Sequence, residues 1–467
     1  MADQLGTRRG TRHAVVIGGS IAGLLAARVL AEHAERVTIV ERDRFPVEPE
    51  PRAGVPQGRH LHVMLTGGQR ALEELLPGIV GDLREHGAPV VGMPEDIVQW
   101  QQGRWYRRTP ATVHFFTGTR PLVEHLVRRR VLADPRISAV EGTEASGLAG
   151  DATRVRGVVL RERGAGRNKP PRVLEADLVV DASGRGSHAS EWLAAIGAEP
   201  PREEVIDTGL AYATRLYRPG RAQDDGDFKG HYLIPNPEQT YGGVVLPVEG
   251  GRYLVTLSGL RGEEPPTDGD AFEKYAERLP HPVLRDWLAK AEPESAVHGF
   301  RASSNVRRRY DRPGLRPAGF LATGDALCTF NPVYGQGMSV AAISAVALRD
   351  ALADPRRTPT TRRVQRALFA ASRQAWDISA GADKNMPGAE GSAARTRPAD
   401  RPVAWYLKRI QDRAPGDPVV GSAFRSALAL STPLTSLFAP PVLRATLFGP
   451  VRGTPAAPPL HRESGAE

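Results

Sequence analysis

The sequence contains a single cysteine, Cys328, among 467 residues. One cysteine excludes disulfide bonds within the chain and any metal cluster built from several cysteines. A chain without disulfides is typical of a reducing compartment. We therefore expect a cytoplasmic protein that holds no metal.

Long hydrophobic runs are also missing. No uninterrupted apolar segment reaches the roughly 18 residues that a membrane-spanning helix needs. Residues 1–13 are basic and carry no apolar stretch of their own. The sequence therefore predicts neither a membrane span nor a secretory signal.

Negative charge is scarcer than positive charge, since 53 Asp and Glu face 62 Lys and Arg, for a net charge of +9. A polyanionic partner would explain this excess, but arginines occur in every segment of the chain. The densest clusters, residues 128–130 and 307–309, have no interleaved aromatic side chains that could stack on bases. We therefore expect no nucleic-acid partner.

The length and the 40% content of hydrophobic residues fit two or three packed units. Residues 13–17 predict a buried strand, 21–33 a helix rich in Ala and Leu, and 36–41 a second strand. Short connections between a strand, a helix and a strand are typical of a parallel sheet.

A glycine-rich turn joins the first strand to the helix, with the spacing Gly18, Ser20 and Gly23. Such a turn lets the backbone approach a pyrophosphate, and the helix N-terminus faces it with its amide groups. Glu41 follows at the end of the second strand, where an acid can accept hydrogen bonds from a ribose. We expect Arg42, next to it, to bind the cofactor too. A plain tight turn would give the same glycine pattern, but the flanking strands and Glu41 favour a dinucleotide site.

In a nicotinamide-dependent dehydrogenase, further alternating strands and helices would normally follow this strand–helix–strand unit. They do not follow here. The chain continues instead with "RFPVEPEPRAGVPQGRHLH" and returns to apolar strands only far downstream. A cofactor held by widely separated segments indicates FAD.

A second glycine-rich stretch, "GDALCTFNPVYGQGMSVA" at residues 324–341, lies between an apolar strand and an Ala-rich helix. An acid at the end of the strand could accept hydrogen bonds from ribityl or ribose hydroxyls. Helix N-terminal amides stabilise the negative charge of a reduced flavin, and glycines let the backbone lie against a flat ring. The alternative is a helix entry with a loose turn. The predicted cofactor contacts here are Asp325, Pro332, Gly335, Gln336, Gly337 and Met338.

The remaining pattern adds strands and helices. Short runs between residues 205 and 260, punctuated by Gly and Pro, predict an antiparallel sheet. Further strands are predicted at 154–160 and 172–181, and further helices at 68–76, 121–132, 269–291, 338–354, 362–380 and within 403–449.

The order and spacing of three motifs, "VVIGGSIAGLLAARVL", "ADLVVDASGRGS" and "GDALCTFNPVYGQGMSVA", resemble the flavoprotein monooxygenases of the aromatic-hydroxylase (p-hydroxybenzoate hydroxylase-like) superfamily. Within it, "GVPQGRHLHVMLTGGQRALEELLPG", "DTGLAYATRLY" and "FNPVYGQGMS" look most like flavin epoxidases of polyether antibiotic biosynthesis. The resemblance covers roughly residues 13–355.

The resemblance implies an α/β fold with a Rossmann-like FAD-binding domain, an antiparallel-sheet substrate domain and C-terminal helices. The division of the chain that we expect is an FAD-binding domain of residues 1–75, 115–190 and 310–355, a substrate domain of 76–114 and 191–309, a helical region of 356–450 and a mobile tail of 451–467.

The resemblance also implies that Arg120 contacts the cofactor near its ribityl–phosphate portion and that Arg59 lies near the flavin. A solvent-exposed Arg120 and a purely structural loop around Arg59 are the alternatives. Single-component hydroxylases have an Asp-Gly pair where this chain has Ser183-Gly184, and a histidine where it has Cys328. These departures leave open whether NAD(P)H reduces the flavin directly or through a separate flavin reductase.

The implied reaction inserts one oxygen atom from O2 through a flavin C4a-hydroperoxide, in a pocket that excludes water. The candidate polar groups of the pocket are Tyr212, Arg215, His231, Tyr232 and Tyr241, although packing or surface roles are the alternative for each. None is a convincing base, and we assign no catalytic side chain. Hydroxylation of a phenol needs a base, whereas epoxidation does not.

We therefore expect epoxidation of an apolar alkene, such as a polyketide or terpenoid intermediate. The C-terminal helices could cap a long apolar pocket or simply pack on the core. An aromatic polyketide hydroxylase and a flavin-dependent double-bond reductase stay open as alternatives. A halogenase is disfavoured because the chain lacks a WxWxIP motif, and a non-catalytic flavin-binding regulator because no partner-binding module is visible.

Overall fold

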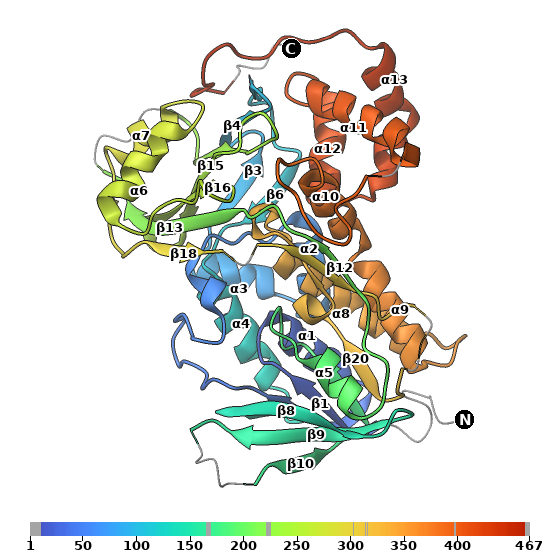
Figure 1. The fold of residues 1–467 in the computed structure, drawn as a ribbon. Helices are drawn as coiled ribbons and strands as arrows, with labels where there is room; N and C mark the ends of the chain where they lie inside the picture. The colour runs from blue at the N-terminus through green and yellow to red at the C-terminus, as the bar shows by residue number, and fades with distance from the viewer. Residues whose placement is uncertain are drawn as a thin grey trace.

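The computed structural model describes residues 11–164, 170–220, 226–301, 303–312, 314, 316–396 and 398–462. Figure 1 shows a central region around a parallel sheet, strands and helices at the upper left, and a separate group of helices at the upper right. The α/β fold with a parallel sheet, antiparallel sheets and C-terminal helices is the one that the sequence predicts.

The N-terminal unit consists of β1 (Thr11–Ile17), α1 (Ile21–Leu30) and β2 (Ala34–Val40). The β-branched residues that end β1 are buried, as expected for a strand covered on both faces. β1 and β2 are parallel neighbours, with Val15 opposite Thr38. The predicted strand–helix–strand unit is confirmed.

Three distant segments complete a five-stranded parallel sheet with the order β20 (Phe320–Ala322), β11 (Leu178–Asp181), β1, β2 and β7 (Ile137–Val140). The carboxyl ends of parallel strands meet at one edge of a sheet. The turn after β1, the loop after β11 and the loop after β20 therefore lie at the same edge.

Helices cover this sheet. α4 (Arg120–Leu132) packs against α1, and α8 (Gly337–Ala353) packs against α1, α2 (Thr66–Leu75) and α9 (Thr361–Ala371). α8 is apolar around most of its surface because it lies between other helices. α8 begins at Gly337, within the second glycine-rich stretch.

Two further helices share the central core. α3 (Ile79–Glu85) packs against α2 and α4, and α10 (Arg373–Asp383) buries Trp376 in the same apolar cluster as Leu368 of α9. We therefore propose that residues 76–88 and 356–383 belong to the central unit, and keep the other domain boundaries as predicted.

An eight-stranded mixed sheet forms the upper-left region of Figure 1. All of its neighbouring strands are antiparallel except β14 and β4, which are parallel. The strands are, in spatial order, β17 (Glu292–Pro293), β13 (Ala211–Arg218), β16 (Arg252–Gly259), β15 (Gly242–Val248), β14 (Gly230–Leu233), β4 (Ile97–Gln101) and β5 (Arg104–Trp105), with β18 (His298–Phe300) also paired to β13.

One face of this sheet is covered by α6 (Gly269–Tyr275) and α7 (Val283–Leu288). The sequence predicted one helix over residues 269–291. The structure has two because Pro280 and Pro282 cannot continue a helical hydrogen-bond pattern.

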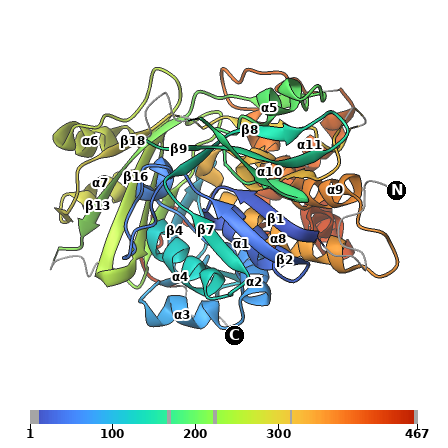
Figure 2. The ribbon, with the colours of Figure 1, turned by 90° about the horizontal axis from the view of Figure 1, so that it is seen from below.

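Smaller sheets complete the fold. Figure 1 places the sheet of β8 (Thr143–Gly150), β9 (Val155–Glu162) and β10 (Arg172–Glu175) at the bottom, and Figure 2 views the molecule from that side. The predicted single strand 172–181 is two strands, β10 and β11, in different sheets. Asp177 between them accepts hydrogen bonds from the backbone amides of Arg12 and His13, at 2.9 and 3.0 Å.

Two short sheets lie elsewhere. They are β3 (Val90–Met93) with β6 (Val113–Phe116), and β12 (Glu203–Ile206) with β19 (Asn305–Arg308) and β21 (Cys328–Thr329).

The C-terminal helices are α11 (Arg401–Arg413), α12 (Pro418–Leu428) and α13 (Pro440–Phe448). They enclose an apolar cluster of their own, which also takes in Tyr106 from the chain segment after β5. The predicted helix 362–380 is divided at Ser372 into α9 and α10.

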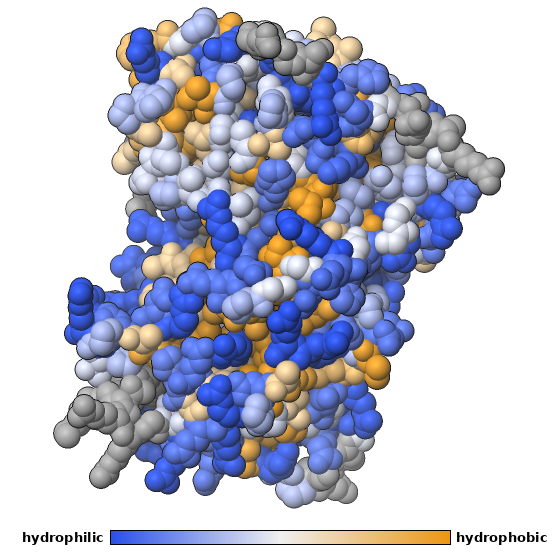
Figure 3. All heavy atoms as spheres, turned by 180° about the vertical axis from the view of Figure 1, so that it is seen from behind, coloured by the Kyte–Doolittle hydropathy of each residue, from blue (hydrophilic) through white to orange (hydrophobic). Residues whose placement is uncertain are grey.

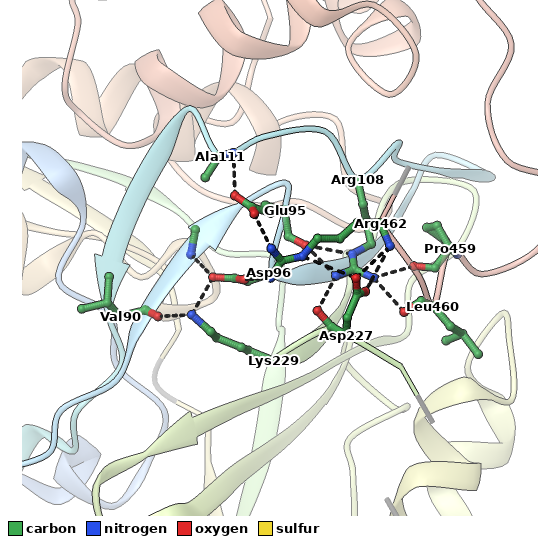
Figure 4. A network of polar contacts seen from close by, with 11 residues as sticks. Val90, Glu95, Asp96, Arg108, Ala111, Asp227, Lys229, Pro459, Leu460 and Arg462 are labelled. Carbon is green, nitrogen blue, oxygen red and sulfur yellow. Dashed lines mark hydrogen bonds and ion pairs between the residues drawn. The ribbon is translucent and has the colours of Figure 1, made fainter. Parts of the chain in front are cut away.

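The described part of the tail crosses to the eight-stranded sheet and binds there (Figure 4). The buried guanidinium of Arg108 donates to the carbonyl oxygens of Pro459 and Leu460, at 3.1 and 2.8 Å, and to Asp227 at 2.7 Å. Arg462 pairs with Glu95 at 2.5 Å. These contacts differ from the mobile tail predicted for 451–467, of which 463–467 lie outside the described residues.

No helix within the described ranges is long and apolar enough to cross a membrane. Hydrophilic side chains cover most of the face in Figure 3, and apolar side chains appear as patches between them.

We expect a chain that ends at residue 457 to be less stable than the full chain. Arg108 would lose two of its acceptors, and a hydrogen bond to a charged group contributes about 1.5–3 kcal/mol. Thermal unfolding should show a lower midpoint for this chain, while a control chain that ends at Arg462 should match the full protein. Equal midpoints for all three chains would contradict the anchoring role of the tail.

Candidate active site

A single cavity of about 1910 Å³ runs from the edge of the parallel sheet, past the eight-stranded sheet, to the C-terminal helices. Thirteen of the cofactor and pocket residues predicted from the sequence line it: Gly18, Ser20, Glu41, Arg42, Arg120, Tyr212, Tyr232, Asp325, Pro332, Gly335, Gln336, Gly337 and Met338. The two glycine-rich stretches, more than 300 residues apart in the sequence, therefore open onto one space.

The first glycine turn has the conformation that its sequence requires. Gly18 has φ +100, and a Cβ there would lie 2.5 Å from the carbonyl oxygen of Ala182. Gly23 does not line the cavity. A Cβ on Gly23 would lie 1.8 Å from the carbonyl oxygen of Gly18, so this glycine permits the close approach of α1 to the turn.

Glu41 is buried at the end of β2 and is oriented by the backbone. Its carboxylate accepts hydrogen bonds from the amides of Gly19 and Asp43, at 2.8 and 2.9 Å. Arg52 contacts Glu41 at 3.0 Å, Asp43 at 3.3 Å and Glu124 of α4 at 2.7 Å. Sequence reasoning missed Arg52, because nothing in its loop indicates that it meets three carboxylates.

The side chain of Ser20 does not cap α1. Its hydroxyl donates to Glu124 at 2.6 Å and accepts from Arg120 at 2.8 Å. The Nε of Arg120 is buried and has no hydrogen-bond partner among the described residues. Burial lowers the pKa of Arg120, although Glu124 and Asp325 act in the opposite direction. An acceptor from a bound molecule would satisfy this arginine.

Asp325 follows β20 at the same edge of the sheet. Burial raises the pKa of its carboxyl group, and the charges of Arg185, Arg120 and Arg308 oppose that shift. Arg185, also missed from the sequence, lines the cavity and donates to Ser304 at 3.2 Å. The mixed charges suit a ligand with both hydroxyl groups and anionic groups.

The loop before α8 is held by one buried carboxylate. Asp383 accepts hydrogen bonds from Asn305 at 2.6 Å, Asn331 at 3.0 Å and Tyr334 at 2.5 Å. Burial raises the pKa of Asp383, although all three hydrogen bonds favour its charged form. The network fixes the position of the loop that the sequence identified.

Within this loop, Gly335 has φ +63 and ends a short 3-10 turn that begins at Pro332. A Cβ on Gly337, the first residue of α8, would meet no atom within 4 Å. The carboxamide oxygen of Gln336 is buried without a partner among the described residues. The start of α8 thus offers open space and an unsatisfied polar atom.

Two histidines, His60 and His62, belong to the segment that packs against this loop. Val63, next to His62, lies against Gly335, because a Cβ on Gly335 would be 2.7 Å from the Cγ2 of Val63. Burial lowers the pKa of His62 to about 3, and the charge of Arg120 lowers it too. Burial also lowers the pKa of His60 to about 4. Both rings are therefore neutral at pH 7.

Besides Gly23, four predicted residues lie outside the cavity lining. The side chain of Arg59 is exposed at the end of a 3-10 turn. Arg215 pairs with Glu273 at 3.1 Å on the α6 side of β13, because alternate residues of a strand face opposite sides. Only the even-numbered Tyr212 of β13 faces the cavity.

The same alternation separates neighbouring residues of β14. Tyr232 lines the cavity, whereas His231 is buried against Phe228 on the other face, with 4.7 Å between the ring centroids. Tyr241 is also outside, because its hydroxyl donates to Glu263 near Arg278. This distinction depends on the register of the strands, which cannot be read from the sequence.

Cys328 lies in β21 and does not line the cavity. Burial raises the pKa of its thiol to about 12, so the thiol is neutral at pH 7. The residue that stands in place of the expected histidine is part of the core.

Comparison with known proteins identifies the family. Residues 11–367 match the model of a family described as "FAD binding domain". The chain belongs to this family. It is an FAD-dependent monooxygenase.

Two relatives and one solved structure are similar over most of their length. Protein Rv3254 of Mycobacterium tuberculosis is 35% identical, over 73% of each chain. The 6-methylpretetramide 4-monooxygenase of Streptomyces rimosus is 27% identical, over 85% of this chain and 91% of its own. The flavin-dependent brominase Bmp2 shares the fold, with a TM-score of 0.63 at 15% identity, over 89% of this chain and 93% of its own.

The cavity of the monooxygenase fits FAD. The backbone of Gly18 leaves room for a close approach, and Gly337 opens onto the cavity without a neighbouring atom. Arg120 and Gln336 each present a buried polar atom that lacks a partner among the described residues. An extended dinucleotide that reaches from Gly18 to Gly337 would cover all four positions.

We expect Gly337→Val to weaken FAD binding at least tenfold, because the side chain would fill the space at the start of α8. Gly81→Val in α3 is the matched control, since a Cβ at Gly81 also meets no atom within 4 Å but faces no cavity. Titration of the apoproteins with FAD, followed by flavin fluorescence, measures both. Wild-type affinity in Gly337→Val would contradict the placement of the flavin.

The lowered pKa values of His60 and His62 lead us to expect that the free energy of unfolding depends on pH. Their pKa values are lower in the folded state than the unfolded value of 6.5, so the unfolded state binds protons first as the pH falls. Each histidine should lower the free energy of unfolding by about 1.4 kcal/mol per pH unit between about pH 6 and its folded pKa.

Urea unfolding between pH 7 and pH 4.5 measures this slope. His62→Gln should reduce the slope by the contribution of one histidine. A wild-type slope that is unaffected by His62→Gln would show that His62 is not buried in its neutral form.

Proposed function

We propose that FAD lies along the cavity with its adenosine and pyrophosphate near Gly18, Ser20 and Glu41. Arg120 and Asp325 would then bind the middle of the cofactor, and the isoalloxazine ring would rest on residues 332–338. This placement is supported by one continuous cavity that is lined by all of these residues. When bound and reduced, FAD would supply two electrons to O2, of which one oxygen atom is transferred to the substrate and the other leaves as water.

The protein contributes orientation and exclusion of water. Beyond the flavin loop the cavity is lined by apolar side chains from both flanking regions, including Trp100, Leu246, Phe300, Phe424 and Leu437. A dry, apolar space protects a reactive oxygen donor from water and favours an apolar substrate. The C-terminal helices would close the far end of this space.

Epoxidation of an alkene is the reaction that we propose. The observation that carries it is the chemistry of the histidines beside the loop. A general base works best with a pKa near the working pH, and His62, with a pKa of about 3, is far below it. Oxygen transfer to an alkene needs no proton removal from the substrate.

Aromatic polyketide hydroxylation is the second candidate. It is favoured by the similarity to the 6-methylpretetramide 4-monooxygenase over 85% of this chain. Its requirement for a phenolate could be met by a substrate that is already acidic.

We propose NAD(P)H as the source of electrons, directly or through a separate flavin reductase. Ser183 stands where an aspartate is expected, and its hydroxyl and amide both bind Asp181, at 2.6 and 3.0 Å. A serine held in this way offers no charge to a nicotinamide donor.

The proposed reaction is tested with a matched pair of substrates, 2-vinylnaphthalene and 2-naphthol, under ¹⁸O₂ with NADH or NADPH and a flavin reductase. We expect a labelled epoxide from the alkene and no change in the naphthol. Hydroxylated naphthol without epoxide would support the second candidate instead. A reduced alkene formed without oxygen would indicate a double-bond reductase.

A further inference from the structure

Arg425 of α12 is a buried arginine that lines the cavity and has no acidic partner. It is 6% exposed, and within the described residues its one hydrogen bond runs from Nε to the hydroxyl of Thr112, at 3.2 Å. Within the described part of the chain it forms no ion pair. The remaining NH groups of its guanidinium are therefore free to bind a ligand.

The other buried arginines are neutralised by carboxylates or tied to oxygen atoms. Arg108 binds Asp227 at 2.7 Å, and Arg308 binds Glu203 at 2.8 Å. Arg128 donates to the carbonyl oxygen of Pro46 at 2.6 Å, and Glu124 is close enough to stabilise its charge. A buried charge without such a partner costs several kcal/mol of stability, so Arg425 is an exception that calls for a function.

The surroundings of Arg425 do not remove its charge. Burial lowers its pKa to about 10, which leaves the guanidinium protonated at pH 7. The one titratable group that affects it is Tyr106, whose own pKa burial raises above the ordinary range of a phenol. Tyr106 instead donates its hydroxyl to Gln101 at 3.0 Å. Among the described residues no carboxylate forms an ion pair with Arg425, and Asp412 of α11, which lines the same cavity, is paired with Lys408 at 3.5 Å.

The guanidinium also has a defined place. It lies over Gly421, one helical turn earlier in α12, where a Cβ would be 3.0 Å from Nη1. The neighbouring lining residues, Phe424 and Leu428, are apolar. The far part of the cavity thus combines apolar side chains with Arg425, while Lys408 and Asp412 of α11, which also line the cavity, pair with each other at 3.5 Å.

We propose that Arg425 binds an oxyanion of the substrate, such as a carboxylate, so that the substrate is an amphipathic acid with an extended apolar body. A planar guanidinium pairs well with a carboxylate, and the pair is strengthened where water is excluded. This inference rests on the proposed oxygenation in the same cavity and adds the group by which the substrate is held. The apolar body would extend from Arg425 toward the loop before α8.

Binding of two probes of equal shape tests the proposal without turnover. The probes are pyrene-1-carboxylate and pyrene-1-carboxamide, titrated into the oxidised FAD-loaded protein and followed by fluorescence anisotropy. We expect the wild-type protein to bind the carboxylate at least tenfold more tightly. Arg425→Met, which keeps the length of the side chain, should lose this preference while its affinity for the carboxamide changes less than twofold.

Two controls accompany this experiment. Arg425→Lys, which keeps the positive charge, should retain a preference for the carboxylate. Arg349→Met, which removes an arginine paired with Glu74 outside the cavity, should behave as the wild type does. Unchanged FAD absorbance reports that each variant is folded.

Equal affinity of the wild-type protein for the two probes would overturn the proposal even if Arg425→Met failed to fold. A preference that persists in Arg425→Met would overturn it too. Because no reductant is present, a failure of oxygen transfer in the substrate experiment leaves this result unaffected, and the two proposals fail independently.

Discussion

The buried ion-pair cluster around Arg52 is the interaction on which the cofactor side of the structure depends. One guanidinium, with a side chain 7% exposed, joins Glu41 at the end of β2, Asp43 after it and Glu124 of α4. Its Nη2 also donates to the carbonyl oxygen of Gly19, at 3.3 Å. Removal of Arg52 would leave the buried carboxylate of Glu41 without its ion-pair partner, which is strongly destabilising.

The cluster links segments that are far apart along the chain. Ser20 and Arg120 are joined to it through Glu124, so the glycine turn and the start of α4 are held relative to each other. Asp383 has the same role on the other side of the cavity, where it binds the loop before α8 from three directions. Two buried carboxylate networks thus hold the two glycine-rich stretches between which we propose that FAD extends.

Charge is distributed differently at the two ends of the cavity. Near the parallel sheet, arginines and carboxylates lie together, and most of their hydrogen bonds are made within the protein. Near the C-terminal helices, Arg425 is surrounded by apolar side chains and has a hydroxyl as its partner. A protein tolerates an unbalanced buried charge where a ligand completes it, because the cost to stability is offset by the specificity gained.

The candidate site residues that could be predicted from the sequence are those that depend on backbone conformation. Gly18, Gly335 and Pro332 were predicted because local geometry restricts which residues can occupy such turns, and Glu41 from the order of strand, glycine turn, helix and acid; all four line the cavity. The α/β class and most helices followed from hydrophobic periodicity for the same local reason.

Tertiary structure alone decided the rest. Whether Arg215 or Tyr212 faces the cavity depends on the register of β13, and a shift of one residue would exchange them. Arg52, Asp383 and Arg425 acquire their roles only through partners, or the lack of them, that come from distant segments. Such pairings leave no local pattern in a sequence, because electrostatic energy depends on distance and burial and not on order along the chain.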